Sequence, residues 1–282
     1  MMTPAQSEER TEVIAAEPVE SLGAMLDIEV GFAPGDPVPP LWHWLYLLDR
    51  RPESELGEDG HPVTGVPTPP GPGRRRMFGG GRVTTLGQLR IGEQATKSTS
   101  ILRSVDKTGR SGDLTVVTVL HQISQDGEVV IREEQDILYR APGSDSLAAA
   151  APSPQPAPDG PQLSLAVDER LLFRFSALTY NAHRIHYDLD WVLREGYDGL
   201  VIHGPLLALM MGEHLRRQGI DLRNRTFAYR LLSPMTRPQT LTVVPSARGL
   251  AHGAEARSAA GVVCASSTLQ EPAASPPLNA AS

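Results

Sequence analysis

The stretch IHGPLLALMMGEHLRR, residues 202–217, carries the clearest structural pattern in this chain of 282 residues. Pro205 marks the first turn of a helix, because a proline there loses no helical hydrogen bond. The apolar side chains that follow fall on nearly every face of that helix, whereas a surface helix has one apolar stripe. Residues 205–217 are therefore expected to form a helix buried on most sides, as when a β-sheet wraps around it.

Strand-like segments surround this helix along the chain. β-Branched and apolar residues recur in 226–231, 240–244 and 256–269, and residues 171–176 (LLFRFS) also resemble a strand. One central helix with several antiparallel strands is thus expected in the second half of the chain.

The first half is predicted to repeat this plan. The stretch PPLWHWLYLL, residues 39–48, predicts a short apolar helix that begins at proline. Residues 114–120 and 129–139 are predicted strands, and Asp126–Gly127 between them is a hairpin signal. The predicted fold class is α+β with two antiparallel sheets, each wrapped around a central helix. This arrangement is a double hot-dog, although periodicity alone also fits other α+β layouts.

Composition divides the chain into five parts. We predict a disordered lead-in at 1–20, an N-terminal half at 21–140, an Ala/Pro linker at 141–161, a C-terminal catalytic half at 162–270 and a disordered tail at 271–282. Residues 51–73 are rich in proline and glycine and long for a loop, which is typical of a binding or lid segment.

The overall charge and the cysteine count exclude several functions. A net charge of −7 disfavours nucleic acid as a partner, because it repels a phosphate backbone. The lone Cys264 cannot form an internal disulfide, which favours a cytoplasmic location. The apolar run 206–211 is far shorter than the roughly 20 residues that span a bilayer, so no membrane partner is expected.

The densest polar cluster is TYNAHRIHYD, residues 179–188. Histidine titrates near neutrality and can move a proton, so His186 and His183 are candidate catalytic bases. Asn181 can donate and accept hydrogen bonds and so hold a water molecule. The ordinary alternative is a pair of structural histidines. A metal site formed with His203 is a weaker alternative, because neither a nearby cysteine nor an HExxH pattern supports it, and no metal or cofactor is expected.

Two further elements suit a charged ligand. A helix that begins at Gly204 leaves backbone N–H groups free, and Gly204 and Leu206 are the candidate donors to a thioester oxygen. Four arginines lie in RRRMFGGGR, and Arg74, Arg75, Arg76 and Arg82 are candidate binders of phosphate or carboxylate. An ordinary helix start and a solvated basic turn are the alternatives.

These residues resemble the MaoC-like dehydratase superfamily. FSALTYNAHRIHYD at 175–188 and IHGPL at 202–206 are similar to its central motifs, and RRMFGGGR at 75–82 and EQDILYR at 134–140 extend the resemblance into the first half. The branch it resembles is the double hot-dog branch, which includes mesaconyl-CoA and itaconyl-CoA hydratases and 3-hydroxyacyl-thioester dehydratases. The wider superfamily carries an aspartate where this chain has Asn181, which removes one potential base.

The resemblance implies a hydro-lyase that adds water to an enoyl-CoA. His186 would act as base, Asn181 would orient the water, and CoA would be part of the substrate rather than a cofactor. A C5 dicarboxylyl-CoA is the expected substrate, and straight-chain 3-hydroxyacyl thioesters are the alternative. A thioesterase and a non-catalytic acyl-CoA-binding protein are the competing hypotheses, and the protein would be a monomer or a homodimer.

Overall fold

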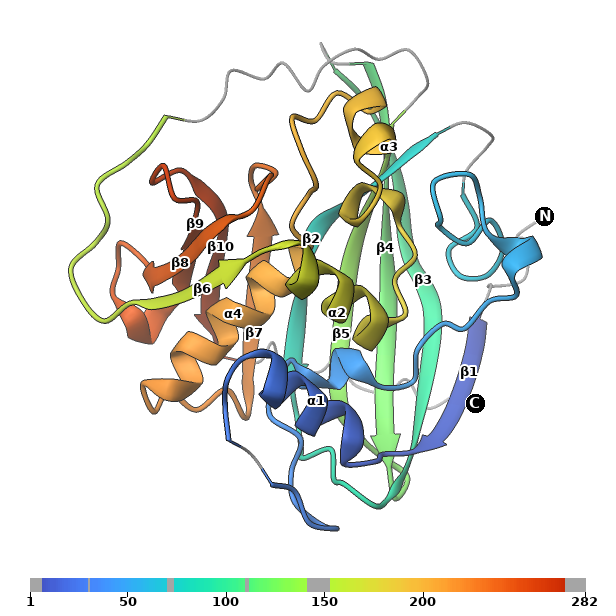
Figure 1. Ribbon diagram of the computed structural model, residues 1–282. Coiled ribbons are helices and arrows are strands. Elements are labelled where there is room, and N and C mark those ends of the chain that lie inside the picture. Colours follow the sequence, from blue (N-terminus) through green and yellow to red (C-terminus); the bar gives the residue numbers. More distant parts are fainter. Residues whose placement is uncertain (1–6, 30, 70–73, 110–111, 141–152, 272–282) are drawn as a thin grey trace.

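The computed structural model describes residues 7–29, 31–69, 74–109, 112–140 and 153–271. Within these ranges ten strands form one antiparallel sheet, in the order β1-β3-β4-β5-β2-β7-β10-β9-β8-β6 (Figure 1). They are β1 (Ser7–Val13), β2 (Arg75–Thr85), β3 (Gln94–Gly109), β4 (Gly112–Gln125), β5 (Glu128–Arg140), β6 (Leu163–Val167), β7 (Arg225–Leu231), β8 (Gln239–Pro245), β9 (Ala254–Arg257) and β10 (Val263–Gln270). The first five strands and the last five form two halves, which are joined where β2 pairs with β7.

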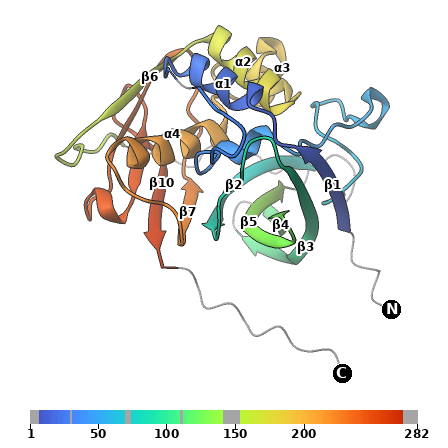
Figure 2. The same cartoon turned by 90° about the horizontal axis from the view of Figure 1, so that it is seen from below.

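Helix α4 (Gly204–Arg217) is the central element of the second half. It contacts β7, β8, β9 and β10, and Figure 2 shows it lying against this part of the sheet. Every residue from Leu206 to Leu215 is buried, which explains why the helix is apolar on nearly all faces. The predicted central helix is confirmed here, and so is the predicted α+β class.

The first half has no matching central helix among its described residues. The predicted helix at 39–48 is wrong, because only a short 3₁₀ turn, η1 (Trp42–Leu45), forms there. Leu41 and Leu47 both have positive φ, 71° and 55°, and a helix cannot continue through that conformation. The inner face of the strongly curved strands β2–β5 is therefore not filled by a helix (Figure 2).

The segment predicted as a strand at 171–176 is also helical. It lies in α2 (Glu169–Thr179), whose first turn is capped by Asp168, with Oδ1 accepting from the backbone N–H of Leu171 at 3.0 Å. Leu171, Leu172 and Phe175 are buried on one side, while Phe173 is 69% exposed, and this spacing fits a helix. Helix α3 (Leu189–Arg194) follows α2 along the chain and is capped by Asp188, with Oδ1 accepting from the backbone N–H of Trp191 at 2.9 Å.

The predicted disordered lead-in is wrong for residues 7–20. Strand β1 pairs with β3 from Ser7 to Val13, and helix α1 (Glu17–Met25) follows it. Ile14 and Val19 are fully buried, so the segment belongs to the core. The predicted linker falls partly, and the predicted tail almost wholly, on residues 141–152 and 272–282, which lie outside the described residues.

The predicted strands at 114–120, 129–139, 226–231 and 240–244 all lie within β4, β5, β7 and β8. The segment 256–269 is two strands rather than one, because a turn separates β9 from β10. Within the described residues, no helix is long and apolar enough to span a lipid bilayer.

Candidate functional site

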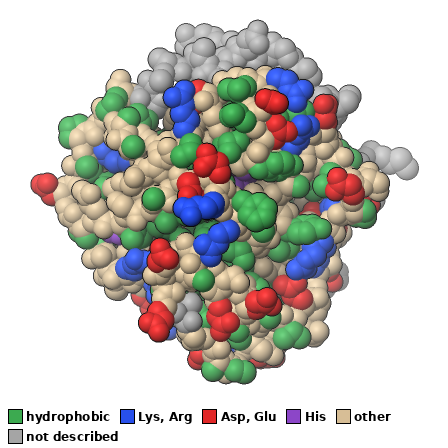
Figure 3. Space-filling view, viewed as in Figure 1, with side chains coloured by type: hydrophobic (Ala, Val, Ile, Leu, Met, Phe, Trp, Pro, Cys, Tyr) green, Lys and Arg blue, Asp and Glu red, His purple; other side chains and the backbone are tan. Residues whose placement is uncertain are grey.

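A cavity of about 1200 Å³ lies between the two halves of the sheet. Its apolar wall includes Phe78, Val119 and Ile137 from the first half and Phe175, Leu207 and Leu231 from the second. His61, His183 and His186 also line it, and Figure 3 shows only small areas of histidine on the outer surface of this face. The first half has no central helix among its described residues, and the cavity lies against the inner face of its strands.

His186 is held as a neutral base at one wall of this cavity. Its Nδ1 lies 2.7 Å from the carbonyl oxygen of Val201, and because a carbonyl only accepts, Nδ1 carries the hydrogen. The lone pair is then on Nε2. Burial lowers the pKa of His186 to about 4, so the ring is neutral at pH 7.

His203 supports the ring of His186. The two rings stack with centroids 3.6 Å apart, and the Nε2 of His203 pairs with the Ser176 hydroxyl at 2.8 Å. His203 immediately precedes α4, so this stack places His186 beside the start of the helix. The ring of His183 meets that of His186 edge-on, at 5.5 Å.

Asn181 builds the loop that carries these histidines. Its Oδ1 accepts from the backbone N–H of His183 at 2.9 Å, and its own backbone N–H donates to the carbonyl of Ser176. One acceptor position of the amide is thus used within the loop, while the side chain still lines the cavity. Tyr180, at φ 51°, ends α2 and turns the chain into this loop.

The two predicted oxyanion donors differ. Gly204 begins α4 and lines the cavity, and a Cβ at this position would lie 2.3 Å from Cδ1 of Leu231. Leu206 is fully buried outside the cavity wall, and its N–H donates to the carbonyl of His203 at 3.0 Å. The prediction is therefore corrected for Leu206, because its N–H already has a partner, and Gly204 remains the candidate.

The four arginines predicted to bind an anion lie in different environments. Arg82 forms ion pairs with Glu134 at 2.8 Å and Asp136 at 3.0 Å, so its prediction as an anion binder is corrected. Arg75 pairs with Glu195 at 2.9 Å, and Arg74 donates to Thr115. Arg76 alone among the four lines the cavity.

The glycines between these arginines serve strand packing. A Cβ on Gly80 would lie 2.3 Å from the carbonyl oxygen of Tyr229, and one on Gly81 would lie 2.4 Å from that of Glu134. Both glycines therefore allow the strands to approach closely at the junction of the two halves.

Two residues of the long loop, Asp59 and His61, also belong to the site, although no motif in the sequence predicts them. The loop contains the 3₁₀ turn η2 (Glu53–Glu55), and its His61 lines the cavity with its ring 3.9 Å from that of His183. The only sequence signal was the unusual length of the loop. No local pattern links residues so distant along the chain.

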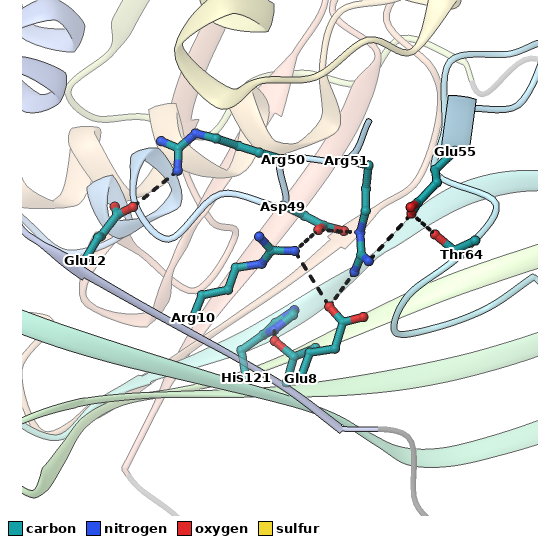
Figure 4. A network of polar contacts seen from close by, with 10 residues as sticks. Glu8, Arg10, Glu12, Asp49, Arg50, Arg51, Glu55, Thr64 and His121 are labelled. Atoms are coloured by element: carbon teal, nitrogen blue, oxygen red, sulfur yellow. Dashed lines mark hydrogen bonds and ion pairs between the residues drawn. The ribbon is translucent and has the colours of Figure 1, made fainter. Parts of the chain in front are cut away.

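A charged network fastens this loop to β1 (Figure 4). Arg51 donates to Glu8 and also contacts Asp49 at 2.7 Å, and Arg10 reaches the same Asp49. Glu12 accepts from the backbone N–H of Leu47 at 2.6 Å. The segment predicted to be a disordered lead-in therefore positions one wall of the site.

A second polar group lines the cavity in the first half. The Glu133 carboxylate accepts from Trp44 Nε1 and Gln135 Nε2, both at 2.8 Å, and lies 3.1 Å from His43 Nε2. Burial alone raises the pKa of Glu133, but the hydrogen bonds lower it to about 2, so the carboxylate is ionised. Lys97 and His121 line the same region.

Asp59, His61 and His183 bring one potential donor atom each within 4.8 Å of one another. His61 Nδ1 and Asp59 Oδ2 are hydrogen-bonded to each other at 2.9 Å, so we treat the cluster as a hydrogen-bonded pair beside a third ring and not as a metal centre. The alternative metal site would use His186 and His203. In each ring one nitrogen is already hydrogen-bonded, His186 to the carbonyl of Val201 and His203 to the hydroxyl of Ser176.

The buried histidines predict a loss of stability in mild acid. The folded-state pKa of His186 is about 4, against about 6.5 in the unfolded chain, so the unfolded state binds more protons as pH falls through that window. Between pH 7 and pH 5 His186 alone should lower the free energy of unfolding by about 2 kcal/mol. Denaturant unfolding at pH 5, 6 and 7 measures this loss, and a flat profile would contradict the burial of neutral rings.

The fold and the site define a hot-dog enzyme of the hydratase and dehydratase class. The family model "hydroxyacyl-thioester dehydratase type 2" matches residues 41–237, and the chain belongs to this family. It is 43% identical, over 83% of this chain and 84% of the relative, to mesaconyl-C(4)-CoA hydratase of Chloroflexus aurantiacus. It is 29% identical, over 74% of this chain and 78% of the relative, to the mitochondrial hydroxyacyl-thioester dehydratase type 2 of Schizosaccharomyces pombe.

Solved structures show the same architecture. HtdX of Mycobacterium tuberculosis matches 94% of this chain and 100% of its own, with a TM-score of 0.62 at 13% identity. A second protein from that organism, described as a double hot-dog fold, matches 96% of each chain with a TM-score of 0.57 at 13% identity. The predicted double hot-dog is therefore confirmed, but its two halves share one continuous sheet and, within the described residues, only the second half has a central helix. The chain is a hydro-lyase, as its relatives are.

Proposed function

We propose that this enzyme adds water reversibly across the 2,3 double bond of a C5 dicarboxylyl-CoA, such as mesaconyl-CoA or itaconyl-CoA in its 2-enoyl form. The observation that carries the proposal is the pairing of two groups in one cavity. His186 presents an unprotonated Nε2, and its stacking partner His203 leads directly into Gly204 at the start of α4. The 43% identity to a mesaconyl-C(4)-CoA hydratase supports the choice of acyl group.

The mechanism follows from the fixed tautomer. Nε2 of His186 takes a proton from water as the water oxygen bonds to C3, and negative charge moves to the thioester oxygen. The N–H of Gly204 and the positive end of the α4 dipole stabilise that oxygen. Nε2 then returns the proton to C2, which completes the addition. Asn181 helps to orient the water through its amide, and His183 is the reserve candidate for the base.

Arg76 is the proposed partner of the free acyl carboxylate. A C5 acyl group is short, so its second carboxylate lies within a few bonds of the reacting carbon and must be bound near the histidines. Besides burial, the positive charge of Arg76 lowers the pKa of both His61 and His183, which places it near these rings. Within the described residues the Arg76 side chain has no hydrogen bond or ion pair, so its guanidinium is free for a substrate.

Arg76→Ala should therefore change specificity. Loss of a charge-assisted hydrogen bond of about 1.5–3 kcal/mol should lower kcat/KM for mesaconyl-CoA by about 10- to 100-fold. Crotonyl-CoA, which has no second carboxylate, should lose far less. Steady-state kinetics on both substrates measure the ratio, with Arg230→Ala on the exposed side of β7 as the matched control. Equal losses on the two substrates would remove Arg76 from carboxylate binding.

A dehydratase of straight-chain 3-hydroxyacyl thioesters is the second candidate. The large apolar cavity and the 29% identical yeast relative favour it. Incubation with crotonyl-, itaconyl- and mesaconyl-CoA separates the candidates. We expect enoyl absorbance to fall fastest with a dicarboxylyl-CoA and no thiol to be released. A clear preference for crotonyl-CoA would favour the second candidate, and release of free thiol would indicate a thioesterase.

A further inference from the structure

Asn181 lines the cavity beside the histidines and carries an amide, not a carboxylate. An amide cannot act as a base, and the Oδ1 of Asn181 already accepts from the N–H of His183. A water molecule has two O–H groups, and His186 Nε2 can accept only one of them. One acceptor position of the Asn181 amide is thus used within the loop, and a neutral ring nitrogen in the cavity wall would be a second acceptor for the attacking water.

The loop around Asp59 is docked directly on the loop that carries the histidines. The carbonyl of Asp59 accepts from the N–H of Arg184 at 2.9 Å, and the carbonyl of Glu58 accepts from the Arg184 guanidinium at 3.2 Å. Gly60, at φ 86°, packs so closely that a Cβ would lie 1.9 Å from the carbonyl oxygen of Ala182. Only glycine fits this contact, which fixes the position of its neighbours.

The ring of His61, like that of His186, is held by a hydrogen bond from Nδ1 to an oxygen acceptor. Its Nδ1 donates to Asp59 Oδ2 at 2.9 Å, while Asp59 Oδ1 accepts from the backbone N–H of His61. The lone pair is therefore on Nε2, which has no hydrogen-bond partner among the described residues. The ring lines the cavity and packs against His183, which in turn meets His186.

We infer that His61, oriented by Asp59, is a second catalytic group of the reaction and the water-binding partner of His186. This inference rests on the proposed hydration. The attacking water donates one O–H to Nε2 of His186, which takes that proton, and the other to Nε2 of His61, which keeps its neutral state. The oxygen lone pair is then aimed at C3, the C3–O bond forms, and the proton on His186 passes to C2. The first half of the chain thus supplies a group to the chemistry of the second half.

The charges around His61 support this role. Burial lowers its pKa, the Arg76 charge lowers it further, and Asp59 raises it. His183 and His186 are the other titratable groups beside it, and burial lowers their pKa values to about 2 and about 4. His61 must be neutral to accept from water. Activity should therefore fall in acid as His61 becomes protonated, and removal of the Asp59 charge should move that fall to lower pH.

The test compares three variants of the full chain with mesaconyl-CoA and crotonyl-CoA. His61→Asn should lower kcat by about 10²-fold, the typical cost of misplacing a reacting group, with a smaller change in KM. Asp59→Asn should give a smaller loss and shift the acidic limb of the kcat/KM profile downward. The double variant should be no slower than His61→Asn, because Asp59 acts through His61. His252→Asn, an exposed histidine in the 3₁₀ turn η4 (Leu250–His252), is the matched control.

Three results would overturn the inference. One is near-normal turnover in folded His61→Asn, and another is additive losses in the double variant with an unmoved acidic limb. The third is stoichiometric metal in the purified protein with activity lost on chelation, since Asp59 and His61 would then bind a metal instead of each other. Failure of the wild-type enzyme to hydrate any enoyl-CoA would instead overturn the proposed function, so the two failures are distinguishable.

Discussion

His186→Ala is expected to lower turnover by about 10²- to 10⁴-fold, the range for loss of a positioned acid–base group. The variant loses the only Nε2 that is oriented by the Val201 carbonyl and stacked on His203 beside α4. Binding of the CoA portion should change little, so the effect should appear in kcat more than in KM. Steady-state hydration of mesaconyl-CoA and of crotonyl-CoA measures it.

Folding must be checked in the same preparation, because His186 is buried. A cooperative unfolding transition like that of wild type establishes that the variant is folded, and His252→Ala serves as the control. Near-normal turnover in folded His186→Ala would assign the base to another ring. A large loss in His183→Ala would then identify His183, which lies 5.5 Å from His186.

Glu133→Ala is expected to destabilise the fold by about 3–5 kcal/mol, the usual cost of removing one member of a buried charged network. The Glu133 side chain is 4% exposed, and its carboxylate binds His43, Trp44 and Gln135. The variant leaves these polar groups in the first half without their shared acceptor. Denaturant unfolding at pH 7 measures the change in the free energy of unfolding.

Glu128→Ala provides the matched control on the same strand. Glu128 is exposed at the start of β5, and its replacement should change stability by no more than about 0.5 kcal/mol. Similar small losses in both variants would show that the first half does not depend on the carboxylate of Glu133.

The second half could be predicted from the sequence because its signals are local. The all-round apolar pattern of 205–217 matches α4, and Asn181, His183, His186 and Gly204 all line the cavity that α4 helps to form. The strand prediction for 171–176 is wrong because it rests on apolar composition and not on the spacing of the apolar residues. Leu171, Leu172 and Phe175 follow a helical period that was visible in the sequence.

The first half was less predictable because its structure depends on distant contacts. Positive φ at Leu41 and Leu47 interrupts the expected helix, and no residue type at either position signals it. The lead-in looked disordered because it is polar, yet Glu8, Arg10 and Glu12 are held by partners from Leu47 to Arg51. His61 reaches His183 through a loop without periodicity, so only the length of that loop pointed to a function.

The central claim is that water adds to carbon 3 of an intact thioester. Its most direct test is product analysis after reaction of wild-type enzyme with mesaconyl-CoA in water labelled with heavy oxygen. The account predicts one labelled hydroxyl group on C3 with CoA still attached, and an initial rate of labelling about 10²- to 10⁴-fold lower with His186→Ala. Label in a released carboxylic acid together with free CoA thiol would contradict it.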